Sequence, residues 1–261
     1  PQTLILPDGR RLHYVEQAGP EPTLLFLHGI GMTWAVWQGT MRRLSGRYRL
    51  FAADLRGHGE SDWLPPRAAD DGPDIAYEPP SYAEDIAVLV DALRLEDAII
   101  VGSSLGGLVA VVTAVLRPQR IAGLCLVDPP LGNPRRGYLE SFRRLREAKV
   151  SGHDAIVEAL LAGAPGAQAA WVRPMARMIE QVDPRVLRAA EVGREEYVDL
   201  SEWLPQVRQP VLLMRADAAK GAALTSPAAE RALELLPNAE LVDFPGSGHA
   251  IHAEQAAKFI E

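Results

Sequence analysis

A Gly-Ser-Ser-Leu-Gly sequence at positions 102–106 constrains the fold more than any other feature of this chain. An apolar run at 97–101 precedes it, and a helix-like apolar run at 108–116 follows it. This context predicts a strand that turns sharply into a helix, with glycines where the backbones pack too closely for a side chain. Such a turn holds a serine hydroxyl out from the sheet, facing the N–H groups and positive dipole end of the helix. Only Ser104 fits the centre, because centring the motif on Ser103 places Val101 and Leu105 at the small positions.

Strand-like and helix-like segments alternate along most of the chain. Several of the strand-like runs are apolar throughout, which is typical of strands buried on both faces of a sheet. We predict strands at 12–16, 23–27, 48–53, 97–101, 121–127, 211–214 and 240–244. We predict helices at 34–44, at 108–116, at 227–236 and from 254. A further helix is predicted to follow Ser81, which would cap it with Glu84 as the capping-box partner. This alternation predicts an α/β fold, a mostly parallel sheet with helices on both faces.

Residues 131–203 differ in character from the rest, because they contain few β-branched runs. They read as several short helices, at 137–149, 153–162, 167–181 and 184–197. We therefore predict a core formed by 1–130 and 204–261, with 131–203 inserted as a helical cap. The cap is expected above the carboxyl edge of the sheet, where open α/β sheets bind ligands.

Composition and charge exclude several classes of function. The 261 residues carry a net charge of −7 and no Lys/Arg-rich tract, so no nucleic-acid partner is expected. No apolar run is long enough to span a bilayer and no signal-peptide pattern is present, so we expect no membrane association and a cytoplasmic location. Cys125, the single cysteine, is expected to be a buried small hydrophobe. No histidine pair has metal-ligand spacing and no phosphate-binding glycine pattern occurs, so no metal and no cofactor are expected.

A serine nucleophile needs a base, and six histidines are available. His249 lies in a glycine-rich loop just after a predicted strand and late in the chain, and the order serine, acid, histidine is the one that this type of strand–turn–helix enzyme uses. Imidazole suits the role because it both accepts and returns a proton near neutral pH. His252 is expected to begin the last helix, while His28 and His58 are expected to shape loops.

Four motifs in order resemble the α/β-hydrolase superfamily, most closely its small bacterial esterase, haloperoxidase and ring-cleavage hydrolase branch. They are His28-Gly29, the loop 54–62, the serine motif 102–106 and the Gly-Ser-Gly-His sequence at 246–249. The resemblance covers nearly the whole chain except the cap. It implies that Ser104 attacks a carbonyl and that His249 is the base. It further implies an oxyanion hole made by the backbone N–H groups of Leu105 and Ile30, donors that typically contribute about 2.7–4 kcal/mol each.

The acid that orients the histidine departs from the family pattern. The family usually places an Asp about three residues past the strand at 211–214, but that position is Ala219 here and Asp217 comes two residues early. Related enzymes sometimes use the end of the strand after the nucleophile helix, which is Asp128. Either carboxylate would hold the imidazole tautomer and stabilise the imidazolium. We favour Asp128 and keep Asp217 as the alternative.

These residues predict a serine hydrolase that cleaves a carboxylic ester of a small molecule, or a related acyl substrate, through an acyl-enzyme. The same residues suit a lactone, an amide or a carbon–carbon bond, and a non-catalytic ligand-binding member of the fold is a further alternative. Epoxide hydrolases and haloalkane dehalogenases are disfavoured, because they use an Asp where this chain has Ser104. Candidate pocket residues are His28, Trp171 and Met175.

Overall fold

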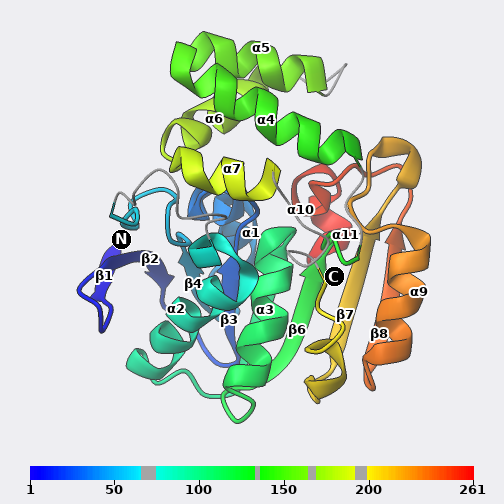
Figure 1. Ribbon diagram of the computed structural model, residues 1–261. Helices are drawn as coiled ribbons and strands as arrows, with labels where there is room; N and C mark the ends of the chain where they lie inside the picture. Colours follow the sequence, from blue (N-terminus) through cyan, green and yellow to red (C-terminus); the bar gives the residue numbers. More distant parts are fainter. Residues whose placement is uncertain (66–74, 133–135, 164–168, 192–198) are drawn as a thin grey trace.

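The structure, a computed structural model, describes residues 1–65, 75–132, 136–163, 169–191 and 199–261. Eight strands form one sheet in the order β1-β2-β4-β3-β5-β6-β7-β8. At one edge, β2 pairs antiparallel with both β1 and β4. The other neighbouring strands, β4-β3-β5-β6-β7-β8, all pair in parallel (Figure 1). The strands are β1 (Gln2–Ile5), β2 (Arg11–Gln17), β3 (Thr23–Leu27), β4 (Arg49–Ala53), β5 (Ala98–Ser103), β6 (Ile121–Val127), β7 (Val211–Ala216) and β8 (Ala239–Phe244).

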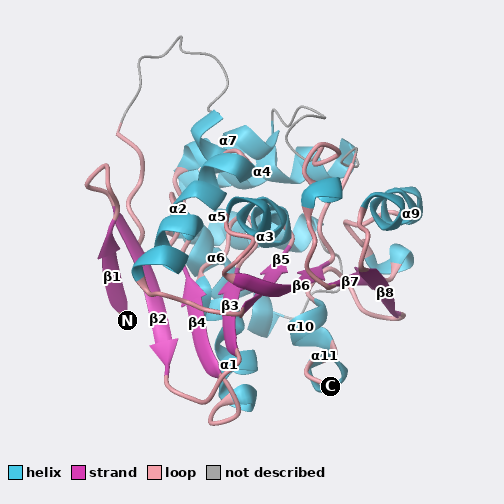
Figure 2. Ribbon diagram, turned by 90° about the horizontal axis from the view of Figure 1, so that it is seen from below, coloured by secondary structure: helices cyan, strands magenta, loops and turns pink. Residues whose placement is uncertain are grey.

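Helices cover both faces of this sheet, as Figure 2 shows. One face carries α1 (Gln38–Leu44), α10 (Ile251–Glu254) and α11 (Ala256–Phe259). The other face carries α2 (Pro79–Ala92), α3 (Leu105–Leu116) and α9 (Ser226–Leu235). Short 3-10 helices lie at η1 (Trp34–Trp37), η2 (Ile75–Tyr77), η3 (Leu204–Gln206) and η4 (Ala218–Lys220). The predicted α/β fold with a mostly parallel sheet is confirmed.

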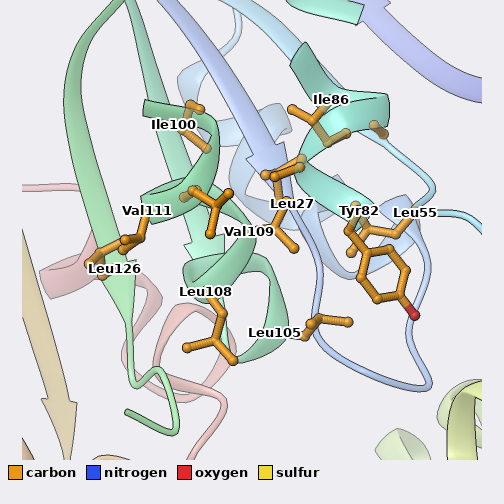
Figure 3. Close-up of a cluster of buried hydrophobic side chains, with 14 of the residues drawn as sticks. Leu27, Leu55, Tyr82, Ile86, Ile100, Leu105, Leu108, Val109, Val111 and Leu126 are labelled. Carbon is orange, nitrogen blue, oxygen red and sulfur yellow. The ribbon is translucent and has the colours of Figure 1, made fainter. Parts of the chain in front are cut away.

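The central strands are buried because their sequences are apolar on both faces. All five residues of β3 are buried, as the continuous apolar run at 23–27 predicts. In Figure 3, Leu27 of β3, Ile100 of β5 and Leu126 of β6 lie around the apolar side chains of α3, among them Val109. Full burial of such a side chain contributes about 1.5–3 kcal/mol. Leu105 also lies in this cluster, so the start of α3 is fixed by packing.

Four helices lie together above the carboxyl ends of the strands (Figure 1). They are α4 (Arg136–Ser151), α5 (His153–Gly163), α6 (Ala169–Glu180) and α7 (Pro184–Glu191). They match the helices predicted in 131–203, except that 167–168 and 192–197 lie outside the described residues. The backbone N–H of Asp183 donates to the carbonyl of Gly57 at 2.8 Å, and Tyr77 Oη donates to the Asp183 carboxylate at 2.6 Å. These bonds join α7 to the loops of the sheet.

Several helices differ from the sequence predictions. α3 begins at Leu105 in place of 108, and the helix predicted at 34–44 is η1 followed by α1. α2 begins at Pro79, two residues before the predicted Ser81 cap, because two prolines suit the first turn of a helix. The chain near its end forms α10 and α11 in place of a single helix from 254, and His252 lies inside α10. No helix in the part of the chain that the structure describes is long and apolar enough to cross a membrane.

Candidate active site

Ser104 sits at the turn from β5 to α3 in a conformation that L-residues rarely adopt. Its backbone angles are φ 53° and ψ −118°, and its side chain is buried. Strain of this kind costs about 1–3 kcal/mol and persists only where the surroundings enforce it. Here the backbone N–H of Ser104 donates to Val127 of β6 at 3.0 Å, and its carbonyl accepts from the N–H groups of Gly107 and Leu108.

The glycines on either side of Ser104 are required by close backbone approaches. A Cβ at Gly102 would lie 2.2 Å from the carbonyl oxygen of Gly106. A Cβ at Gly106 would in turn lie 2.2 Å from the carbonyl oxygen of Leu27 in β3. No side chain fits at either position, so the packing of α3 onto β3 and β5 explains why the turn has this sequence.

His249 lies in the loop after β8 and meets the carboxylate of Asp128, which follows β6. Nδ1 of His249 is 2.6 Å from Oδ2 of Asp128. Asp128 is fully buried, and three backbone N–H groups also donate to it, from Ala216, Ala223 and Leu224. Because Nδ1 donates to the carboxylate, Nε2 is the imidazole nitrogen left to accept a proton.

Asp217, the alternative acid, binds backbone N–H groups and not the histidine ring. Its Oδ1 accepts from the N–H of Ala219 and its Oδ2 from the N–H of Gly246, both at 2.8 Å. These backbone hydrogen bonds, from Gly246 first, lower the pKa of its carboxyl group. Its own N–H donates to the carbonyl of Ser247. Asp217 therefore caps η4 and fastens the loop that carries the histidine, while Asp128 meets the ring.

The loop after β3 carries Ile30 past the serine. A Cβ at Gly29 would lie 3.1 Å from Cβ of Ser104, so the two backbones are in close contact. Ile30 is half-buried and follows directly. Leu105 is the first residue of α3, and N–H groups in the first turn of a helix have no partner within the helix. The two predicted oxyanion donors therefore belong to segments that flank Ser104.

Two fully buried histidines hold the peptide groups on either side of Ile30. Nδ1 of His28 donates to the carbonyl of Gly29 at 2.8 Å, and Nε2 of His58 accepts from the N–H of Gly31 at 3.3 Å. Burial lowers the pKa of His58 to about 3, and burial also lowers the pKa of His28. Both rings are therefore neutral at physiological pH, as an accepting nitrogen requires.

Asp54 anchors the far end of the same loop. Its Oδ1 accepts from the N–H of Trp34 at 2.7 Å, and its Oδ2 lies 2.7 Å from Nδ1 of His13. Burial opposes its ionisation, but the hydrogen bonds from His13 and the backbone outweigh that effect and lower its pKa. Sequence reasoning assigned no role to this carboxylate. The position of Asp54 at the end of a buried strand, ahead of a glycine-rich loop, is the signal that points to it.

The three candidate pocket residues lie in different settings. His28 is fully buried, and its Nε2 accepts from the N–H of Leu55 at 3.0 Å, so both of its ring nitrogens are engaged within the protein. Trp171 is 56% exposed on α6, and Met175, one turn later, is half-buried. His252 is buried against Trp37, with ring centroids 4.5 Å apart, and burial lowers its pKa to about 4. Among the described residues, no cluster of His, Cys, Asp and Glu has the arrangement of a metal site.

Comparison with known proteins shows the family of the chain. The alpha/beta hydrolase fold profile matches residues 22–256. The chain is 32% identical to the 2-(acetamidomethylene)succinate hydrolase of Mesorhizobium japonicum, over 94% of this chain and 87% of that one. It is also 32% identical to the pimeloyl-[acyl-carrier protein] methyl ester esterase of Nitrosomonas europaea, over 95% and 96% of the two chains. The crystal structure of E-2-(acetamidomethylene)succinate hydrolase superposes with a TM-score of 0.78 at 25% identity, covering 99% of this chain and 95% of that one. The chain belongs to the α/β-hydrolase fold family.

Proposed function

We propose that this protein is a serine hydrolase that cleaves a carboxylic ester through an acyl-enzyme. The strained backbone of Ser104, φ 53° at the turn between β5 and the start of α3, is the observation that carries the proposal. It is the conformation expected of a nucleophile presented at the edge of an α/β sheet. If Ser104 only formed a turn, a glycine would adopt the same backbone angles without the strain that a Cβ imposes.

His249 is the base and Asp128 the acid in this proposal. The 2.6 Å bond from Nδ1 to Asp128 fixes the tautomer in which Nε2 accepts the serine proton. It also favours the imidazolium that forms, because a buried carboxylate faces the new positive charge. Three backbone N–H groups donate to Asp128 and hold its carboxylate in place beside the imidazole ring.

The reaction then proceeds in two halves. Oγ of Ser104 attacks the ester carbonyl carbon while His249 takes its proton, and the N–H groups of Leu105 and Ile30 stabilise the oxyanion. The C–O bond breaks and the alcohol leaves with the proton from His249, which leaves the acyl group on Ser104. Water attacks the acyl-enzyme, gives its proton to His249, and the carboxylic acid departs as Ser104 recovers its proton.

An amide substrate is the second candidate. It is favoured by the relative named as a 2-(acetamidomethylene)succinate hydrolase, because an acetamido group contains an amide bond. The relative named as a methyl ester esterase favours the ester, and it matches at the same identity over a larger share of both chains. An amide would use the same residues, with an amine in place of the alcohol as the leaving group.

Paired chromogenic substrates test this proposal. We expect the rate enhancement over the uncatalysed reaction to be larger for p-nitrophenyl butyrate than for butyryl p-nitroanilide, which has the same acyl group on an amide. Ser104→Ala should lower kcat by at least about 10³-fold, as expected for loss of a nucleophile. Ser103→Ala is the matched control, a buried serine one residue earlier, and should retain kcat within about threefold.

The outcomes separate the candidates. A larger rate enhancement for the anilide would replace the ester by an amide. Turnover that persists in Ser104→Ala, or no turnover of either substrate by the unaltered protein, would contradict the proposed function.

A further inference from the structure

A groove lies where α6 meets the start of η1. Its volume is about 520 Å³, and it opens to solvent between the helical layer and the sheet. One wall is a side of α6 with Arg173, Pro174, Arg177 and Met178, and the other wall contains Thr33 and Trp34. It therefore joins a helix of the predicted cap to the loop that anchors on Asp54.

The charge that lines this groove is positive, and only one of its two arginines has an ion-pair partner among the described residues. Arg173 and Arg177 are four residues apart on one helix, so their side chains share a face, and like charges at this spacing repel. Within the described part of the chain, Arg177 makes no ion pair or hydrogen bond, and no carboxylate lines the groove. The nearest acid to Arg173 is Asp154 at 3.8 Å, whose side chain is 88% exposed. An exposed pair at that distance contributes little.

Apart from Thr33 and Gln181, the rest of the lining is apolar. Trp34 and Met178 are half-buried, and Pro174 and Ala35 complete the apolar part of the lining. A guanidinium pairs with a carboxylate through two parallel hydrogen bonds, and it does so better than a lysine ammonium. Two arginines beside an indole and a thioether therefore match a carboxylate that is attached to a hydrocarbon group.

We propose that this groove is a binding site for a carboxylate with an apolar tail. Thr33 lies four residues after Gly29, which contacts Ser104, so the groove is built on the far end of the loop that passes the serine. Two sources of this chemistry exist. One is a second carboxyl group on the substrate itself, an assignment that rests on the proposed function. The other is a free carboxylic acid, which ester hydrolysis produces.

The binding arm of the test does not depend on catalysis. Calorimetric titration of the Ser104→Ala protein with hexanoate is compared with hexanamide, which has the same tail without the charge. Hexanoate should bind at least about fivefold more tightly, and adding Arg177→Gln should weaken its binding by about five- to tenfold. Arg188→Gln is the matched control, because Arg188 is exposed on α7 outside the groove. It should leave the affinity for hexanoate unchanged.

The kinetic arm separates the two sources. The KM for monomethyl adipate, an ester with a second carboxyl group, is compared with that for methyl hexanoate in the Arg177→Gln protein. A KM raised about fivefold for monomethyl adipate alone assigns the groove to the substrate's own carboxylate. Unchanged KM values together with weakened hexanoate binding assign it to the free acid.

The proposal is overturned if Arg177→Gln changes neither hexanoate binding nor the KM for monomethyl adipate. Equal effects of Arg177→Gln and Arg188→Gln would also overturn it, because a nonspecific loss of charge would then explain the result. If the unaltered protein hydrolyses no ester, the proposed function fails, while the hexanoate titration still decides the proposal for the groove.

Discussion

Replacing Asp128 with asparagine is expected to damage both catalysis and stability. Oδ2 of Asp128 receives Nδ1–H of His249 at 2.6 Å and the N–H of Ala223 at 2.7 Å. Oδ1 receives the N–H groups of Ala216 and Leu224, both at 3.2 Å. All four partners are donors, so the NH₂ group of an asparagine faces two donors in either orientation.

The expected size of each effect follows from this geometry. Two buried donors left without acceptors cost about 1–3 kcal/mol each, so the free energy of unfolding should fall by about 2–6 kcal/mol. A unit charge about 4 Å from the imidazolium contributes about 4 kcal/mol at an effective dielectric constant of about 20. Losing that attraction in the transition state should lower kcat by about 10³-fold.

The assay measures kcat for p-nitrophenyl butyrate and the urea midpoint by circular dichroism. Asp217→Asn is the matched control, since it makes the same change of charge on the residue that fastens the histidine loop. It should keep kcat within about threefold. An Asp128→Asn protein that retains more than about a tenth of the original kcat, or an Asp217→Asn protein that loses as much, would refute the assignment of the acid.

Three further predictions concern the supports of the site. Gly102→Ala should lower the free energy of unfolding by about 3 kcal/mol or more in urea, because its Cβ would lie 2.2 Å from a carbonyl oxygen, whereas Gly39→Ala in open space should not destabilise the protein. His58→Asn removes the acceptor of the Gly31 N–H and should lower kcat about tenfold with little change in KM; a change in KM alone would contradict the bracing role. The folded-state pKa of His252, about 4, lies below the unfolded value of about 6.5, so the unfolded state binds more protons and stability should fall as pH drops from 6.5 to 4, by about 1.4 kcal/mol per unit. Urea titrations at pH 7, 6 and 5 should therefore show a shallower loss for His252→Phe than for the unaltered protein.

Local patterns were sufficient to predict most of the fold. The run at 23–27 matches β3 residue for residue, because a strand buried on both faces is apolar at nearly every position. The serine turn is equally local, since the glycines and the strand and helix that flank it are contiguous. The edge strand β1 was missed, because it is short and mostly exposed and so lacks an apolar pattern.

The orientation of the histidine depends on contacts that no local pattern records. Asp128 and Asp217 both follow parallel strands at the same edge of the sheet, so sequence position alone does not separate them. The choice is made by backbone N–H groups at Ala216, Ala223 and Leu224, which lie about ninety residues along the chain from Asp128. The hydrogen bond between His58 and Gly31 is also not predictable from a local pattern, because it joins two separate loops.

The central claim is that Ser104 is an activated nucleophile. Labelling with a fluorophosphonate, followed by mass spectrometry of the intact protein and its peptides, tests this claim most directly, because the reagent reacts with serines that a neighbouring base activates. The account predicts one adduct per chain, on the peptide that contains Ser104, and no adduct in Ser104→Ala or after prior unfolding in urea. An unlabelled protein, or an adduct on any other residue, would contradict it.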